Sequence, residues 1–253
     1  MLSGMTNLQK SSTNSQCYYC GKGFLSKEQL YKHLEDFHST TRGEKSVINV
    51  VKSNPQTPNY VVNFLEKSQN YCVCLVDIVN STEISASLTQ QKLSKYYEVF
   101  LNSMAQIVES FGGFVIKNIG DSLLYYFPYS SDASKGYDFR NCLECGLKMI
   151  EEHDKINEIL KKHKLPSLDY RISADYGEVS IMETNNSSTI DVFGTPVNIC
   201  TKINHIADKN AIVIGSDLYR TVKKINDYEY NMVNSCSIGM KYMYPVYSVQ
   251  RKF

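Results

Sequence analysis

The spacing of apolar residues separates a polar N-terminal region from a long, regularly patterned C-terminal region. From Tyr71 to the end of the chain, apolar positions recur at strand and helix spacings. Short apolar runs predict strands, and apolar residues three or four positions apart predict amphipathic helices. The expected strands are 71–79, 114–119, 123–127, 168–176, 179–182, 212–214 and 244–249. The expected helices are 93–111, one marked by apolar residues over 143–160 and ending near Pro166, and 195–207.

Turn-forming residues set the boundaries between these elements. The run 71–79 alternates little, as expected of a strand buried at the centre of a sheet. A tight hairpin is expected around Gly120, Asp121 and Ser122, and a second one around Tyr176-Gly177. Residues 60–65 follow Pro58 and predict a short helix.

The order of these elements indicates the fold class. Strand, helix, strand, strand, helix, strand is the order of an α+β sandwich of the ferredoxin-like kind, and we expect residues 70–253 to form it. Residues 41–69 are rich in Ser, Thr, Asn and Pro, which predicts a linker. Residues 15–40 then form a separate small unit at the N-terminus.

Composition narrows the classes of protein. Apolar residues make up 42% of the 253 residues and charged residues 21%, which is typical of a soluble globular protein. A net charge of +1 with no basic block gives no argument for a nucleic-acid partner. No apolar run approaches the ~18 residues of a membrane span, and the first sixteen residues lack the apolar core of a signal peptide. We therefore expect a cytoplasmic protein with no membrane attachment, whose eight cysteines are reduced thiols or metal ligands.

The small N-terminal unit has the ligand spacing of a zinc site. The four candidate ligands are Cys17, Cys20, His33 and His38. Two cysteines separated by two residues and two histidines separated by four close a tetrahedron on zinc. Phe24 and Leu30 lie between the ligand pairs and supply the small apolar core that such a unit needs.

This pattern resembles the Cys-Cys-His-His zinc finger family, which implies a ββα unit with one structural Zn²⁺. The resemblance places Ser26, Gln29 and Lys32 at base-reading positions of the helix. One finger covers only about 3 base pairs in that mode, and its surface is not markedly basic. We favour a regulatory or protein-binding role for the finger. A DNA-binding regulator, with the large domain as dimeriser, is the alternative.

Two acidic residues stand at the ends of expected strands. Asp77 ends the apolar run that begins at Tyr71, where an acid is costly to bury unless it is paired or holds a metal. Asp121 lies at the tip of the first hairpin, a position that Asp also takes for turn geometry alone. Asp77 is equally placed to cap a following helix. Together, the two carboxylates have the chemistry to hold a hard divalent cation.

Three segments resemble the catalytic domain of class III adenylate and guanylate cyclases. They are 76–82 (Val-Asp-Ile-Val-Asn-Ser-Thr), the stretch from Gly112-Gly113 to Gly120-Asp121, and 191–198 (Asp-Val-Phe-Gly-Thr-Pro-Val-Asn). All three occur in family order within residues 71–253. One departure is that Asn80-Ser81 stands where the family has Gly and Phe. The resemblance implies an adenylate cyclase that converts ATP into 3′,5′-cyclic AMP and pyrophosphate.

The resemblance also implies two Mg²⁺ or Mn²⁺ ions in each active site. Their ligands are the matches of Asp77 and Asp121 and the carbonyl of Ile78. One ion lowers the pKa of the ribose 3′-hydroxyl, and the other neutralises the triphosphate.

The family's substrate-binding positions also have matches here. The adenine-selecting pair falls on Lys117 and Asp191, which favours ATP over GTP; read without the family, they are a solvated strand charge and a turn acid. Asn198 matches the ribose-orienting Asn. Lys202 stands where the family has an Arg that stabilises the α-phosphate, and Lys loses the planar two-point fork. Lys241 is the nearest match to the triphosphate-binding Lys, in a register uncertain by one residue.

Family geometry implies a homodimer. Metal ligands come from one protomer, while base and ribose contacts come from the other, and this chain carries both sets. The Lys202 departure keeps open a second interpretation, in which the domain is a catalytically weak cyclase used as a nucleotide sensor.

Overall fold

The computed structural model describes residues 15–16, 23–24, 26, 29–30, 32–33, 61–65, 67–128, 139–184, 190–236 and 243–252. Contacts divide the chain into two units: residues 1–63 with 183–190, and residues 64–182 with 191–253. Each unit is described by itself. The domain limits expected from the sequence stay predictions.

The N-terminal unit contains a small hairpin followed by helical residues. Strand β1 (Ser15–Gln16) pairs antiparallel with β2 (Gly23–Phe24). Gln29, which is helical, donates its backbone N–H to Ser26 Oγ over 3.3 Å, as at a helix N-cap. This strand–strand–helix order agrees with the expected ββα unit. His33 is buried, whereas the other proposed ligands, Cys17, Cys20 and His38, lie outside the described residues, so the zinc site stays a prediction.

The larger unit is built from one mixed sheet and six helices among its described residues. The helices are α2 (Ser81–Ser87), α3 (Gln90–Ser110), α4 (Arg140–Glu151), α5 (His153–Lys162), α6 (Thr195–Asn204) and α7 (Ser216–Val222). The strands are β4 (Gln69–Ile78), β5 (Phe114–Ile119), β6 (Ser122–Pro128), β7 (Tyr170–Thr184), β8 (Asp191–Phe193), β9 (Ala211–Gly215), β10 (Tyr228–Cys236) and β11 (Tyr244–Arg251). The short strand β3 (Val62–Phe64) spans the boundary between the two units. Among the described helices, none is both long and apolar enough to cross a membrane.

Strand β4 lies in the interior of the sheet, between β7 and β6. The strand order is β10-β11-β9-β7-β4-β6-β5, and β4 pairs antiparallel with both β6 and β7. The six residues from Tyr71 to Val76 are each at most 4% exposed, because neighbours cover both faces of the strand. The low alternation of the run 71–79 correctly predicted this position. Strands β7 and β9 pair in parallel.

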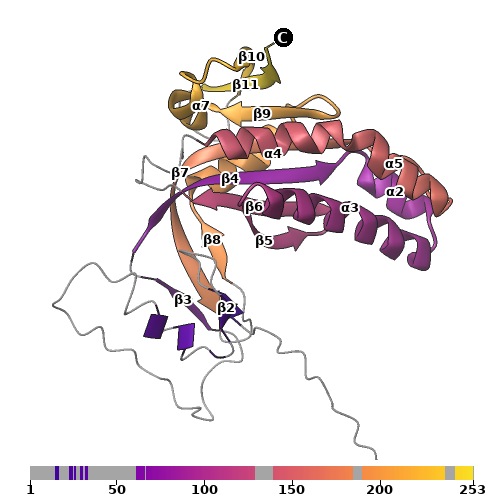
Figure 1. Cartoon of the computed structure of the whole chain (residues 1–253), viewed down its shortest axis with the longest axis horizontal. Coiled ribbons are helices and arrows are strands. Elements are labelled where there is room, and N and C mark those ends of the chain that lie inside the picture. Colours follow the sequence, from indigo (N-terminus) through magenta and orange to yellow (C-terminus); the bar gives the residue numbers. More distant parts are fainter. Residues whose placement is uncertain are drawn as a thin grey trace, which may run out of the picture. The chain divides into compact units, whose positions relative to one another are not determined.

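Helices cover the two faces of the sheet unequally. Helices α3, α4 and α5 pack on one face (Figure 1), where Cys72 and Cys74 of β4 join the main apolar cluster. Helix α6 packs on the other face and forms a smaller cluster around Ile199 and Ile203. Since side chains alternate along a strand, Asp77 lies on the α6 face, opposite the two cysteines.

Three expectations about these elements are wrong. Residues 60–65 contain strand β3 and not a helix. The region 143–160 is two helices, because α4 ends and α5 begins at Glu152. The expected hairpin around Gly177 is instead one continuous strand, β7. A Cβ at Gly177 would lie 3.3 Å from Pro196 Cγ, so the glycine allows a close approach of α6 and does not form a turn. The sequence interpretation also missed α2, α7, β8 and β10.

The fully buried carboxyl group of Asp175, on β7, forms hydrogen bonds with residues of β11 and α7. Asp175 is 0% exposed and receives hydrogen bonds from the Tyr244 hydroxyl at 2.9 and 3.0 Å and from the backbone N–H of Leu218 at 3.3 Å. Burial raises the pKa of Asp175 to about 7, against the lowering effect of these hydrogen bonds, and the nearby Asp217 carboxylate adds to the rise.

This carboxyl makes folding stability depend on pH. The pKa of Asp175 is higher in the folded than in the unfolded state, so its protonation stabilises the fold. This contribution is fully present below about pH 4 and is lost as the pH rises through about 7. We expect the wild type to lose up to about 4 kcal/mol relative to Asp175→Asn between pH 4 and 8. Urea unfolding at several pH values measures the difference. The exposed Asp208→Asn serves as the control, and a difference between wild type and Asp175→Asn that is constant with pH would contradict the assignment.

Candidate active site

Asp77 lies where β4 leaves the core. Val76 and Ile78 on either side are buried, but Asp77 is only half-buried. The last residue pair between β4 and β6 is Val76 with Leu123, so the next residue along β4, Asp77, meets Ser122. Ser122 Oγ donates a hydrogen bond to Asp77 Oδ1. This contact fixes the orientation of the Asp77 carboxylate toward the β5–β6 turn.

The environment of Asp77 penalises its charge. Burial is the largest effect and raises the pKa of Asp77, and the Asp121 carboxylate raises it further. The hydrogen bond from Ser122 and the nearby His205 and Arg171 side chains act in the opposite direction. The net result is a raised pKa, because burial and the Asp121 carboxylate outweigh these effects.

Asp121 is placed by a two-residue hairpin loop. Ile119 pairs with Ser122, and Gly120 adopts φ +63° as the first residue between them. Glycine at that position is typical of tight hairpin loops. The loop directs the Asp121 side chain inward, where its Oδ2 is buried and has no hydrogen-bond partner among the described residues. A buried carboxylate oxygen without a partner is expensive unless a ligand satisfies it.

These carboxylates have the donor chemistry for divalent cations. Asp77 and Asp121 come close enough for their charges to repel, and both offer the hard oxygen atoms that Mg²⁺ and Mn²⁺ prefer. Ile78 follows Asp77 directly as the last residue of β4. The unsatisfied oxygen of Asp121 and the raised pKa of Asp77 both fit a site that binds cations.

Lys117 and Asp191 form an ion pair between β5 and β8. Lys117 Nζ donates to Asp191 Oδ2, and the backbone N–H of Val192 donates to Asp191 Oδ1 over 2.9 Å. The Lys117 side chain is 43% exposed and that of Asp191 20%, so both groups remain accessible. The structure therefore brings these two predicted residues together. Among the described residues, no hydrogen bond or ion pair joins them to Asp77 or Asp121.

Helix α6 carries the next two predicted residues. Asn198 and Lys202 are four positions apart and lie on the same exposed side of the helix. The helix begins after Gly194, where a Cβ would lie 2.6 Å from the backbone oxygen of Glu178. Only glycine allows this close approach between the start of α6 and β7.

Sequence analysis missed two residues that position the others. Ser122 orients Asp77, as described above. Asn204 is buried on α6, and its Nδ2 lies 3.4 Å from Leu75 O, 3.3 Å from Arg171 O and 3.2 Å from Ser173 Oγ. It thereby ties α6 to β4 and β7. The available signal was an amide on the apolar face of a helix, next to Ile203.

One predicted residue of this site cannot be placed. Lys241 lies outside the described residues, between β10 and β11. Its role stays a prediction.

Comparison with a family model identifies the larger unit. The model of the adenylate and guanylate cyclase catalytic domain matches residues 64–250. An adenylate cyclase of Streptomyces coelicolor is 27% identical over 144 residues, which are 56% of this chain and 31% of that protein. A cytidylate cyclase of Staphylococcus aureus is 21% identical over 184 residues, which are 69% of this chain and 43% of that protein. The chain thus spans less than half the length of these curated relatives.

A solved structure agrees with the family match. The crystal structure of the adenylyl cyclase CyaB from P. aeruginosa matches with a TM-score of 0.65 at 18% identity, over 74% of this chain and 96% of that chain. At this identity the likeness concerns the fold, which is the mixed α+β fold of cyclase domains. With the family match covering most of the chain, the conclusion is that this protein belongs to the adenylate and guanylate cyclase catalytic domain family.

Proposed function

We propose that this protein is an adenylate cyclase that converts ATP into 3′,5′-cyclic AMP and pyrophosphate at the interface of a homodimer. The observation that carries the proposal is the carboxylate pair of Asp77 and Asp121, with an unsatisfied buried oxygen on Asp121. Family membership supports cyclase chemistry, and the similarity to an adenylate cyclase supports the choice of ATP.

Asp77, Asp121 and the carbonyl of Ile78 are the ligands we assign to two Mg²⁺ or Mn²⁺ ions. When bound, the ions lower the pKa of the ribose 3′-hydroxyl and neutralise the triphosphate. Ser122 holds the Asp77 carboxylate in one orientation, which reduces the reorganisation needed for coordination. The 3′-oxygen then attacks the α-phosphorus and pyrophosphate leaves.

The remaining roles belong to α6 and to the loop before β11. We assign Asn198 to orienting the ribose, Lys202 to stabilising charge on the α-phosphate, and Lys241 to the triphosphate. Asn204 holds α6 against β4, so the helix and the carboxylate strand keep a fixed relation within one protomer. In a homodimer, the carboxylates of one protomer face the α6 residues of the other, and two equivalent sites form.

Lys117 and Asp191 are the residues we assign to base selection. In the structure they are paired with each other. Asp191 has the chemistry to accept from the adenine 6-amino group, and Lys117 to donate to N1. Guanine presents a carbonyl oxygen and an N–H at these places, so both protein groups would face a mismatch. Each unmatched polar group costs about 1–3 kcal/mol.

A second candidate is a cytidylate cyclase. Cytosine also presents an amino donor beside a ring-nitrogen acceptor, so it meets Lys117 and Asp191 with the same polarity as adenine. The similarity to a cytidylate cyclase of Staphylococcus aureus, over 69% of this chain, favours testing this substrate. Adenine and cytosine then differ in size and not in hydrogen-bond pattern at this pair.

We assign one structural Zn²⁺ to Cys17, Cys20, His33 and His38. The hairpin of β1 and β2, followed by helical residues, supports this assignment. A regulatory or protein-binding role suits a single finger without a markedly basic surface.

The first test is product formation by the purified protein with ATP, GTP or CTP and either Mg²⁺ or Mn²⁺. We expect cyclic AMP from ATP, with a preference over GTP of at least about 10-fold because of the two mismatches. Asp121→Asn keeps the side-chain shape but loses a metal ligand, and should lower activity by about 100-fold or more. Glu158→Gln, an exposed change on α5, is the matched control. No cyclic product from a dimeric protein would sink the catalytic proposal and leave a nucleotide sensor, whereas cyclic CMP alone would establish the second candidate.

A second test separates cation binding from activity. Mn²⁺ should raise the melting temperature of the wild type by about 5 °C and leave those of Asp77→Asn and Asp121→Asn unchanged. Without metal, Asp121→Asn should be more stable than the wild type by about 1 kcal/mol, because the repulsion from Asp77 is gone. Thermal unfolding with and without Mn²⁺ measures both effects. Equal Mn²⁺ stabilisation in all three proteins would remove these aspartates from the metal site.

A third test concerns the lysine that replaces the family's arginine. Lys202→Arg restores a planar fork for the α-phosphate, and one added charged hydrogen bond of about 1.5 kcal/mol corresponds to about a 10-fold higher kcat. Lys202→Met, which removes the charge, should lower kcat. Steady-state kinetics with ATP compare the three proteins. If kcat is the same in all of them, Lys202 does not contact the reacting phosphate.

A further inference from the structure

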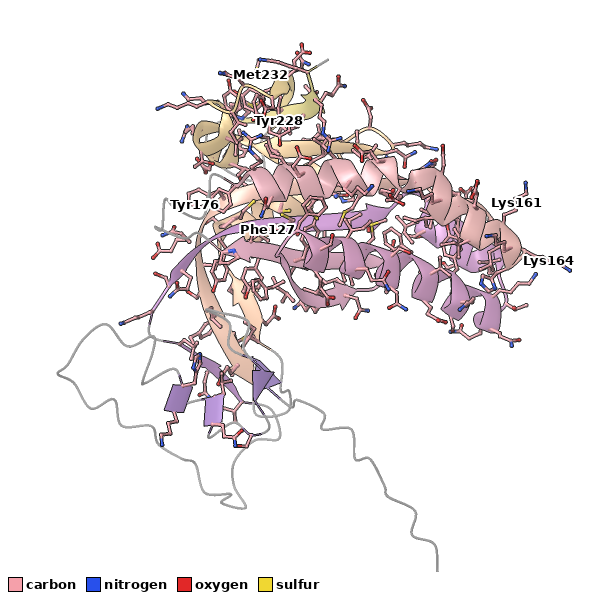
Figure 2. The ribbon with its side chains drawn as sticks, viewed as in Figure 1. Phe127, Lys161, Lys164, Tyr176, Tyr228 and Met232 are labelled. Atoms are coloured by element: carbon pink, nitrogen blue, oxygen red, sulfur yellow. The ribbon has the colours of Figure 1, made fainter. Side chains whose placement is uncertain are left out.

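Three cysteine side chains from two elements meet inside the core. Cys72 and Cys74 project from β4, and Cys142 projects from α4. The Sγ atoms of Cys72 and Cys142 are 3.1 Å apart, those of Cys74 and Cys142 3.5 Å, and those of Cys72 and Cys74 3.9 Å. Figure 2 shows yellow sulfur atoms in the layer between β4 and α4. All three residues are at most 1% exposed.

The cluster is distinct from the cyclase site. Cys72 and Cys74 point to the helix-covered face of the sheet, whereas Asp77 lies on the other face. The other buried cysteines have different surroundings. Cys145 contacts Tyr125, and Cys200 lies 3.2 Å from Ser173 Oγ. The three thiols of the cluster therefore have one another as their sulfur neighbours, on the face of the sheet opposite Asp77.

The spacing of the sulfurs suits a soft metal ion. With metal–sulfur bonds of about 2.3 Å, two thiolates at a tetrahedral ion lie about 3.8 Å apart. The observed separations of 3.1 to 3.9 Å lie within 1 Å of that value for every pair. A disulfide, in contrast, requires one pair at about 2.05 Å and leaves the third thiol without a role.

Ligand type and charge favour the same class of ion. Thiolates select soft cations such as Cu(I) and Zn(II) over Mg²⁺ or Ca²⁺. Among the described residues, no histidine or carboxylate joins this group of ligand atoms. Three thiolates leave the bound ion with a net negative charge, and Cys142 lies in the first turn of α4, where the positive end of the helix dipole reduces that cost.

We propose that Cys72, Cys74 and Cys142 form a binding site for one soft d¹⁰ cation, Cu(I) or Zn(II), that joins β4 to α4. Each cysteine that ligates the ion loses its thiol proton to solvent, so uptake of the ion releases protons. The ion connects the first turn of α4 to the strand that carries Asp77, three residues beyond Cys74. It stabilises the catalytic strand from the side opposite the nucleotide, and the site is independent of the cyclase activity proposed above.

The test counts bound ions on the full chain after anaerobic dialysis against Cu(I) or Zn(II). Cys142→Ala is compared with Cys145→Ala, a buried cysteine on the same helix. The proposed finger is intact in both variants, so the difference between them reports the cluster alone. We expect Cys142→Ala to bind one ion fewer than the wild type and Cys145→Ala to bind the same number. The metal that Cys145→Ala keeps and Cys142→Ala loses is the ion that the cluster binds, copper or zinc.

Two further measurements keep the test independent of folding defects. The ion should raise the melting temperature of Cys145→Ala by about 5 °C more than that of Cys142→Ala. In the wild type, X-ray absorption at the metal edge should detect an ion with a shell of sulfur alone, unlike the mixed nitrogen and sulfur shell of the finger. Equal ion counts in all three proteins, or only mixed shells in the wild type, would overturn the proposal.

Discussion

The proposed chemistry of this domain depends on the position of one carboxylate, that of Asp77. It lies near the end of β4, a strand that is buried on both faces. β4 pairs on both edges and carries helices on both faces, so its backbone position is fixed along nearly its whole length. The backbone of Asp77 is therefore held in place, and the hydrogen bond from the Ser122 hydroxyl restricts its side chain as well. A metal ligand held in this way loses little conformational entropy on coordination, which is how a rigid scaffold increases affinity at a small site.

The same arrangement makes the charges of Asp77 and Asp121 electrostatically unfavourable. Burial and the neighbouring Asp121 both oppose the charge on Asp77, and one oxygen of Asp121 is buried without a partner among the described residues. A stable fold tolerates such local cost when the core supplies the compensation, here the apolar cluster between the sheet and helices α3 to α5. Two bound cations would offset both electrostatic penalties together. The penalties at Asp77 and Asp121 therefore support the proposal that this site binds positive charge.

The sequence predicted the elements best where their formation depends on residues close together in the chain. The helix 93–111 follows from apolar spacing alone, and the hairpin around Gly120 from its turn residues. The error at Gly177 arose because a glycine indicates either a turn or a close approach, and Pro196, which decides between them, is distant in sequence. The family segments located Asp77, Asp121, Lys117 and Asp191. Ser122 and Asn204 were missed because their contacts depend on strand register and helix placement, which only tertiary packing defines.

The proposed base selection by Lys117 and Asp191 depends on the free energy needed to break their ion pair. Lys117 is 43% exposed, so the pair stabilises the free protein by at most about 1 kcal/mol and a base displaces it easily. A base that buries both groups without matching them incurs a penalty of about 1–3 kcal/mol for each. In the proposed function, discrimination against guanine therefore comes from mismatch in the bound state and not from the strength of the free pair. Adenine and cytosine match both groups alike, so in the proposed site any preference between them has to come from the size of the pocket around the base.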